Sequence, residues 1–189
     1  MKLWLIRHGL TRLGEEKRYQ GALDEGLSEH GRAVLKRAEF NPPRVHVSPL
    51  RRAKETAAIL FPQAEQFIVP DLREMDFGTF EGRGWWEMEQ DAAYRAWVDG
   101  GCMGRCPGGE DRAEFSGRVC GAMEGLLQTA GDVLVIVAHG GTQMAALERW
   151  GRPAREYYRW QTPCGCGWLL EYDRTLDEMR VLNEVSYLK

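Results

Sequence analysis

Two histidines in this chain each follow a run of apolar residues. Arg7-His8-Gly9 comes directly after residues 3–6, and His139-Gly140-Gly141 comes directly after the largely β-branched run 133–138. Each run predicts a β-strand, and the second is typical of a strand buried on both faces. Because the carboxyl ends of the strands face the ligand crevice of an open α/β sheet, we expect both histidines to face a bound group. The arginine beside the first histidine favours an anion as that group.

Two further segments carry charged side chains that fit the same chemistry. Arg52 follows a short strand expected at 44–48 and begins a helix expected at 51–60, and Glu74 lies in a loop that also holds Asp76 and Glu81. Arginine suits an anion with several oxygens, because its guanidinium stays charged and binds two oxygens at once. Histidines, arginines and a carboxylic acid are the groups that metal-free phosphoryl transfer needs.

Each of these residues has an expected role. His8 is the predicted nucleophile, whose other ring nitrogen donates to a backbone carbonyl, that of Gly9, and the product is a phosphohistidine. His139 is expected to donate to a phosphoryl oxygen in its protonated form, which a bound anion should favour. A general acid is expected from the loop that holds Glu74, Asp76 and Glu81. The residues predicted to bind phosphate are Arg7, Arg52, His139 and Gly140.

The sequence does not determine whether the pKa of Glu74 is raised or lowered. A cap of tryptophans over the site would desolvate the carboxyl group and raise its pKa, whereas two nearby arginines would lower it. The tryptophans themselves, at positions 85, 86 and 97, are interpreted as packing for the cap in preference to a stacking surface for substrate.

Several further motifs accompany these residues in a fixed order, among them Leu27-Ser28 with Gly31, Ser48-Pro49-Leu50, Phe80-Glu81-Gly82 and Pro107-Gly108-Gly109-Glu110. Together they resemble the histidine phosphatase superfamily, the phosphoglycerate mutase-like proteins. Within it the chain looks most like small bacterial phosphatases of the α-ribazole phosphatase type. The resemblance, together with a position beside the crevice, makes Glu74 the preferred general acid over its alternatives Asp76 and Glu81. Gly14 stands where the family usually has a pocket asparagine, and backbone amides, Arg18 or Gln20 are candidates to fill that space. Glu55 replaces a common glutamine and is expected to face outward.

The element order and the resemblance predict an α/β fold: a single three-layer α/β/α domain over residues 1–189, with a mostly parallel central sheet. A small helical cap insertion at about 70–109 is expected over the active site. Gly117, Gly121 and Gly125 would allow close packing on a helix at about 110–129. Strands are expected at 2–6, 44–48, 66–69, 133–138, 166–173 and 179–186, and further helices at 28–39, 85–98, 141–151 and 153–158.

Bulk properties exclude several classes of protein. The 189 residues suit one domain, and the net charge of −3 argues against a nucleic-acid or anionic-membrane surface. No apolar stretch is long enough for a membrane span, so a cytoplasmic location is expected. An odd count of five cysteines predicts free thiols. A zinc site made by Cys102, Cys106, Cys164 and Cys166 is disfavoured by their spacing, and neither a metal nor another cofactor is expected.

The resulting expectation is a metal-independent phosphomonoesterase that hydrolyses a small phosphorylated metabolite, with α-ribazole 5′-phosphate as the leading specific substrate. The expected partner is that small molecule, and the protein is expected to be a monomer or homodimer. Phosphoglycerate mutase-type phosphoryl transfer is an alternative that the short chain disfavours. A non-catalytic phospho-ligand-binding protein is a second alternative, and the presence of every expected catalytic residue argues against it.

Overall fold

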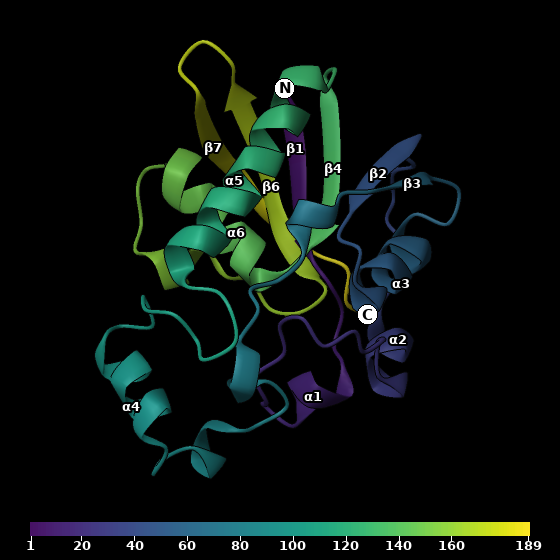
Figure 1. The fold of residues 1–189 in the computed structure, drawn as a ribbon. Helices are drawn as coiled ribbons and strands as arrows, with labels where there is room; N and C mark the ends of the chain where they lie inside the picture. The colour runs from purple at the N-terminus through teal and green to yellow at the C-terminus, as the bar shows by residue number, and fades with distance from the viewer.

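The computed structural model describes residues 1–189 and contains one seven-stranded sheet of order β3-β2-β4-β1-β6-β7-β5 (Figure 1). The first four strands in that order run parallel, whereas β6 and β7 form an antiparallel hairpin beside β1. The predicted α/β class with a mostly parallel sheet is therefore confirmed. The strands are β1 (Lys2–Arg7), β2 (Arg44–Val47), β3 (Glu65–Ile68), β4 (Val133–Ala138), β5 (Gly151–Arg152), β6 (Cys166–Asp173) and β7 (Glu178–Ser186).

Helices cover both faces of the sheet and give the three predicted layers. Helices α5 (Arg112–Thr129) and α6 (Gly140–Trp150) lie over one face, and α3 (Arg51–Leu60) lies beside β2, with α2 (Glu29–Val34) below it in this view (Figure 1). Alternate residues of β4 enter different hydrophobic clusters, with Ile136 on the α5–α6 side and Val137 on the α3 side. This double burial explains why the strand is apolar without interruption.

The segment between β3 and α5 is built from short turns. It contains the 3₁₀ turns η1 (Pro70–Leu72), η2 (Gly78–Phe80) and η3 (Trp85–Glu87), followed by α4 (Ala92–Asp99). The single helix predicted over 85–98 is wrong, because Asp91 caps a new helix by accepting from the backbone N–H groups of Ala93 and Tyr94. Trp97 packs into the main core, whereas Trp85 is 52% exposed and Trp86 is 43% exposed.

Four other local predictions are wrong. Helix α2 ends at Val34, well before the predicted end at residue 39, because Leu35 is extended and bridges to Leu188 near the C-terminus. The segment 153–158 does not form an α-helix, and a 3₁₀ turn, η4 (Tyr157–Trp160), begins at its end. The segment 7–26, for which the sequence predicts a charged loop and neither a strand nor a helix, contains a short helix, α1 (Arg12–Glu15). The three glycines of α5 face open space and pack against nothing.

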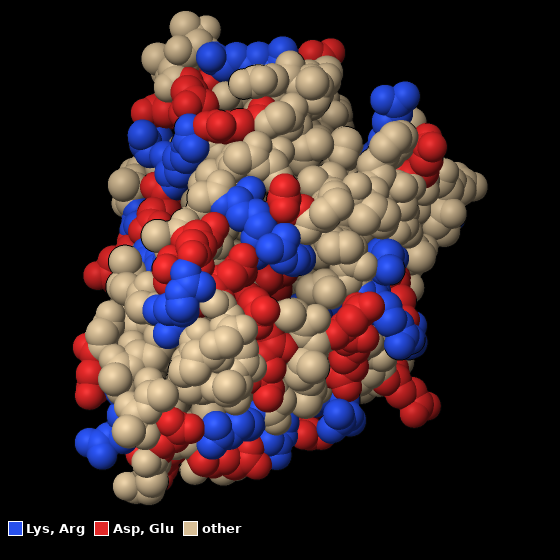
Figure 2. All heavy atoms as spheres, viewed as in Figure 1, with Lys and Arg blue, Asp and Glu red and all other residues tan.

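The surface fits the modest net charge. On the face drawn in Figure 2, basic and acidic side chains are interspersed and no broad patch of one sign is present. None of the helices has the combination of length and apolarity that crossing a bilayer requires.

Candidate active site

The two histidines meet at one edge of the sheet because their strands are parallel neighbours. Arg7 at the end of β1 is in register with Ala138 at the end of β4, so the next residue of each strand is a histidine. The ring centroids of His8 and His139 lie 5.1 Å apart. The sequence prediction that both histidines occupy one crevice agrees with this geometry.

His8 is held as a neutral ring with one free nitrogen. Its Nδ1 lies 2.7 Å from the carbonyl oxygen of Gly9, as the sequence predicts, so Nδ1 carries the proton and Nε2 keeps its lone pair. The backbone N–H of Gly9 in turn donates to Thr56 Oγ1 at 2.9 Å, which anchors that loop to α3. Burial lowers the pKa of His8 well below its usual range, and the charges of Arg52 and Arg7 lower it further. The ring is therefore available as a nucleophile at neutral pH.

His139 is fully buried and uses only one of its ring nitrogens within the protein. Its Nε2 lies 2.6 Å from Ser48 Oγ, and its Nδ1 has no hydrogen-bond partner. Burial lowers the pKa of His139 well below its usual range, with Arg52, His8 and Arg7 acting in the same direction. The protein alone thus favours the neutral ring, and the protonated form expected from the sequence would need the charge of a bound anion.

Arg7 and Arg52 direct their charges at the same crevice without forming ion pairs. Two nitrogens of the buried Arg52 guanidinium donate to the carbonyls of Leu23 and Gly21, each at 2.8 Å, and Arg7 donates to the carbonyl of Thr162 at 2.7 Å. The Nε of each arginine is buried with no acceptor. Because carbonyls orient the guanidinium groups and no carboxylate forms an ion pair with either of them, this corner of the molecule favours an anion.

Glu74 lines the same cavity as His8. It is 9% exposed, and its two carboxyl oxygens accept from the backbone N–H groups of Met75 at 3.0 Å and Gly141 at 3.1 Å. Burial raises the pKa of Glu74, although these hydrogen bonds and the charges of Arg52 and Arg7 act against the rise. The question that the sequence left open, the direction of the Glu74 pKa shift, is answered in favour of a raised pKa.

The two alternative carboxylates are occupied elsewhere. Glu81 accepts from the backbone N–H groups of Leu23 and Phe77 and so ties two loops together. Asp76 accepts from the N–H of Gly78 at 2.8 Å. Neither side chain lines the cavity into which this crevice opens, whereas Glu74 does. Geometry therefore favours Glu74 among the three candidates.

A clamp from α5 holds the loop that carries Glu74. Arg118 donates to the carbonyls of Asp71 at 2.8 Å and Arg73 at 3.0 Å, and it pairs with Glu110 at 2.7 Å. Glu110 also accepts from the N–H of Asp76 at 3.0 Å. This clamp uses the glutamate of the Pro-Gly-Gly-Glu motif and fixes the loop on both sides of the acid.

The crevice opens into a cavity of about 400 Å³ with a polar floor and an aromatic wall. Arg7, His8 and Glu74 line the floor, while Arg52 and His139 lie fully buried behind it. Gly141 lines the cavity, whereas Gly140, predicted to bind phosphate, is buried with Gln161 packed against its Cα. Trp97 takes part in packing and also lines the cavity, together with Tyr19, Phe77, Phe115, Tyr157 and Tyr158.

No side chain simply takes the place of the missing asparagine. Gly14 lines the cavity, but the nearby Arg18 forms an ion pair with Glu87. The Gln20 amide is also engaged, because it accepts from Thr11 and donates to Glu25. The space beside Gly14 is thus bordered by polar groups that already have partners.

Several other residues singled out in the sequence are placed by the structure. Glu55 does not face outward, since it accepts from the N–H of Leu27 at 2.8 Å and pairs with Arg32 at 2.7 Å. All five cysteines are free thiols, and no three His, Cys, Asp or Glu side chains are grouped to hold a metal ion. Sequence reasoning missed Ser48 and Arg118 as parts of the site, although Ser48 belongs to the Ser-Pro-Leu motif.

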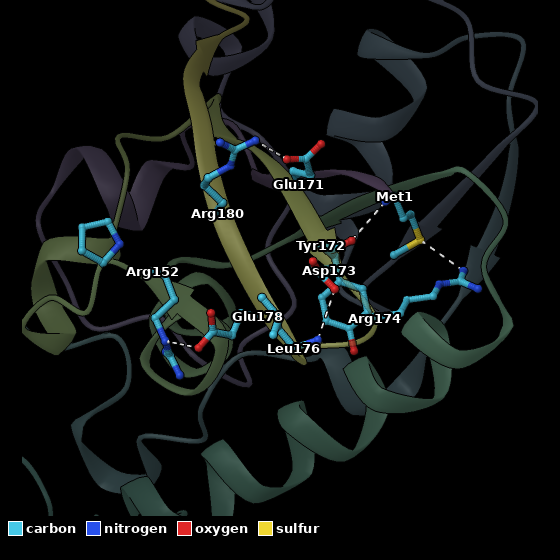
Figure 3. A pocket seen from close by; sticks show the side chains of 10 residues that line it. Met1, Arg152, Glu171, Tyr172, Asp173, Arg174, Leu176, Glu178 and Arg180 are labelled. Atoms are coloured by element: carbon cyan, nitrogen blue, oxygen red, sulfur yellow. Dashed lines mark hydrogen bonds and ion pairs between the residues drawn. The ribbon is translucent and has the colours of Figure 1, made fainter.

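A second cavity of about 670 Å³ lies at the opposite end of β1, around Met1 and the β6–β7 hairpin (Figure 3). Four of its charged side chains pair with one another: Arg152 contacts Glu178 at 2.8 Å, and Arg180 contacts Glu171. None of the residues discussed above lines it. This cavity therefore lacks the unpaired donors and the acid that distinguish the first one.

Comparisons with known proteins agree with this geometry. The family model described as histidine phosphatase superfamily (branch 1) matches residues 3–185. A putative phosphoserine phosphatase 2 from Hydrogenobacter thermophilus is 33% identical over 150 residues, covering 75% of this chain and 74% of that protein. A probable phosphoglycerate mutase from Klebsiella pneumoniae is 33% identical over 150 residues, covering 74% of this chain and 70% of that protein. The solved α-ribazole phosphatase from Shigella flexneri superposes with a TM-score of 0.80 at 29% identity, over 97% of this chain and 96% of that one.

Proposed function

Because the chain belongs to the histidine phosphatase superfamily, we propose that it is a phosphomonoesterase that hydrolyses a small phosphorylated metabolite through a phosphohistidine at His8. One observation supports this most strongly. Arg7 Nε, Arg52 Nε and His139 Nδ1 are buried without partners in the region of His8. A phosphoryl group in its transition state offers three equatorial oxygens and negative charge, which are the acceptors that these nitrogens lack.

The proposed reaction has two steps. His8 Nε2 attacks phosphorus, an N–P bond forms, the P–O bond to the alcohol breaks, and protonated Glu74 gives its proton to the departing oxygen. The Glu74 carboxylate then takes a proton from a water molecule whose oxygen attacks phosphorus. The N–P bond breaks, phosphate leaves, and His8 and the protonated Glu74 are regenerated.

The opposite pKa shifts of His8 and Glu74 support these roles. With ordinary values a glutamic acid loses its proton below the pH at which a histidine becomes neutral, so a neutral nucleophile and a protonated acid would rarely coexist. Burial lowers the pKa of His8 and raises that of Glu74, which enlarges the population holding both required forms.

The aromatic wall supports a substrate whose alcohol has a planar or apolar part. α-Ribazole 5′-phosphate meets that description and is the leading candidate, and the Shigella flexneri relative carries the name of an α-ribazole phosphatase. The free thiols support the expected cytoplasmic location of such an enzyme.

Phosphoglycerate mutase activity is the second candidate, favoured by the Klebsiella pneumoniae relative. A phosphoglycerate carries a carboxylate that needs a cation beyond the phosphate site. Two further arginines line the cavity, but Arg18 pairs with Glu87 and Arg112 pairs with Glu148. Their charges are therefore already compensated, which weighs against the mutase.

The test is a panel of phosphomonoesters: p-nitrophenyl phosphate, α-ribazole 5′-phosphate, O-phosphoserine and 3-phosphoglycerate. The proposal expects inorganic phosphate to be released, fastest from α-ribazole 5′-phosphate. Conversion of 3-phosphoglycerate to its 2-isomer without release of phosphate would identify a mutase. Tight phosphate binding with no turnover of any substrate would identify a non-catalytic binding protein.

Metal independence has its own test. We expect activity to survive excess chelator, because protein cations supply the positive donors, and vanadate to inhibit strongly as a mimic of the trigonal phosphoryl group. Loss of activity on chelation with recovery on adding zinc or magnesium would contradict this part of the proposal.

A further inference from the structure

Ser48 makes a contact that the roles assigned so far do not explain. It is fully buried at the end of β2, and its Oγ lies 2.6 Å from Nε2 of the equally buried His139. A contact this short between two groups out of reach of water is a hydrogen bond whose proton belongs to one of them. Which one holds the proton decides what His139 can offer to a substrate.

The surroundings of Ser48 assign that proton to the serine. The backbone N–H of Leu50 donates to Ser48 Oγ at 3.3 Å, so part of the acceptor capacity of the oxygen is already used. The hydroxyl proton has no acceptor other than His139 Nε2, because Ser48 makes no other side-chain hydrogen bond. A buried hydroxyl that left its proton unused would lose a hydrogen bond. The serine therefore donates, and Nε2 accepts.

An accepting Nε2 requires the proton of the neutral ring to sit on Nδ1. That nitrogen is buried without a partner, and its ring lies 5.1 Å from the ring of His8. The burial that keeps the pKa of His139 low also makes the tautomer matter, because a neutral ring has only one N–H to give. The opposite tautomer would turn a lone pair toward the phosphoryl oxygens.

We propose that Ser48 is a positioning residue that holds His139 in its Nδ1–H tautomer, so that this N–H donates to a phosphoryl oxygen of the substrate. This proposal rests on the proposed function, because the phosphoryl oxygen that accepts the hydrogen bond belongs to the proposed substrate. The two histidines then share one tautomer but use opposite nitrogens: a backbone carbonyl frees Nε2 of His8 to attack, and a serine hydroxyl frees Nδ1–H of His139 to donate.

The direct test measures the tautomer in the unmodified protein. Two-bond ¹H–¹⁵N correlation spectra of protein labelled at histidine, recorded near neutral pH, distinguish a protonated from an unprotonated ring nitrogen. We expect Nδ1 of His139 to carry the proton and Nε2 to be unprotonated. A neutral His139 with its proton on Nε2 would overturn the proposal, and this measurement needs no variant to fold.

Variants supply the functional half of the test. We expect Ser48→Ala to shift the tautomer and to lower both kcat/KM and vanadate affinity about tenfold, the usual size of one lost hydrogen bond to a charged group. Ser48→Thr retains a hydroxyl and should keep most of both. Ser116→Ala is the matched control, because that hydroxyl has a buried oxygen with no partner. Unchanged tautomer and vanadate affinity in Ser48→Ala would overturn the proposal.

The same measurements separate this proposal from the proposed function. An Nδ1–H signal of His139 that shifts when vanadate is added, in a protein that turns over no phosphomonoester, would support the role of Ser48 and contradict the phosphatase. Turnover with the opposite tautomer would support the phosphatase and contradict the role of Ser48.

Discussion

The floor and the wall of the central cavity are built in different ways. On the floor, His8 and His139 directly follow adjacent parallel strands, Arg52 is fully buried, and backbone carbonyls hold both arginines. The aromatic wall comes mainly from segments outside the sheet: Phe77 and Trp97 lie between β3 and α5, and Tyr157 and Tyr158 lie on η4. If the proposed function is right, the strand ends of the sheet would fix where phosphorus sits, and the aromatic wall would determine which alcohol fits.

The largest expected effect lies on the floor. His8→Ala removes the nucleophile, and we expect kcat to fall by about 10⁴-fold or more on every substrate, because no other group can form the covalent intermediate. The exposed His30 provides the control, and His30→Gln should keep full activity. Substantial turnover by His8→Ala would show that the strand-end histidine is not essential.

The next largest effect is expected at Glu74, which the loop between β3 and α5 adds to the floor. Glu74→Gln should lower kcat/KM by about 10²-fold or more on an alkyl phosphate, but much less on p-nitrophenyl phosphate, whose phenolate leaves without a proton. Asp76→Asn should affect both substrates alike and weakly, because Asp76 lies outside the cavity lining. Equal large losses on the two substrates in Glu74→Gln would remove Glu74 from the role of general acid.

The pH dependence sharpens the same contrast. Burial raises the pKa of Glu74, so its protonated form persists to higher pH than in an ordinary glutamate, and alkyl phosphate hydrolysis should fall as pH rises through that pKa. Burial lowers the pKa of His8, so the loss on the acid side should lie below pH 6.5, its ordinary value. Profiles of kcat/KM test both limbs. The alkaline limb should be weaker for p-nitrophenyl phosphate and absent in Glu74→Gln.

The smallest effect is expected at the clamp. Lysine in Arg118→Lys keeps the charge but cannot reach Glu110 and the loop carbonyls together, so we expect up to about tenfold lower activity on alkyl phosphates, with p-nitrophenyl phosphate almost unaffected. The exposed pair of Arg149 with Glu124 supplies the control, Arg149→Lys, which should leave both activities unchanged. A loss shared equally by both substrates would indicate a general structural role.

The same contrast separates what the sequence could predict from what it could not. The strands that deliver His8 and His139 were predictable, because uninterrupted apolar runs ending in polar residues signal buried parallel strands. The helix between β3 and α5 was not predictable at its true length. Helix α4 begins at the N-cap residue Asp91, within an aromatic-rich stretch whose pattern fits a longer helix. The early end of α2 depends on a partner 153 residues away along the chain, Leu188, which local periodicity does not reveal.

Within the site, residue types were predictable and hydrogen-bond partners mostly were not. The bond from His8 Nδ1 to the carbonyl of Gly9 is local and follows from chain geometry. The contact of Ser48 with His139 spans 91 positions, and the direction of the Glu74 pKa shift depends on how fully folding buries that carboxyl group. Such quantities depend on tertiary packing, which no short motif encodes.

The central claim is that phosphate passes through a covalent bond to His8, and trapping that bond tests it most directly. Rapid quench of the enzyme with substrate labelled in the phosphoryl group, followed by peptide mapping under alkaline conditions, should find acid-labile label on the peptide that contains His8. The label should be absent from His8→Ala and should accumulate in Glu74→Gln supplied with p-nitrophenyl phosphate, because activation of water is slowed there. Label on His139, or label retained by His8→Ala, would contradict the account.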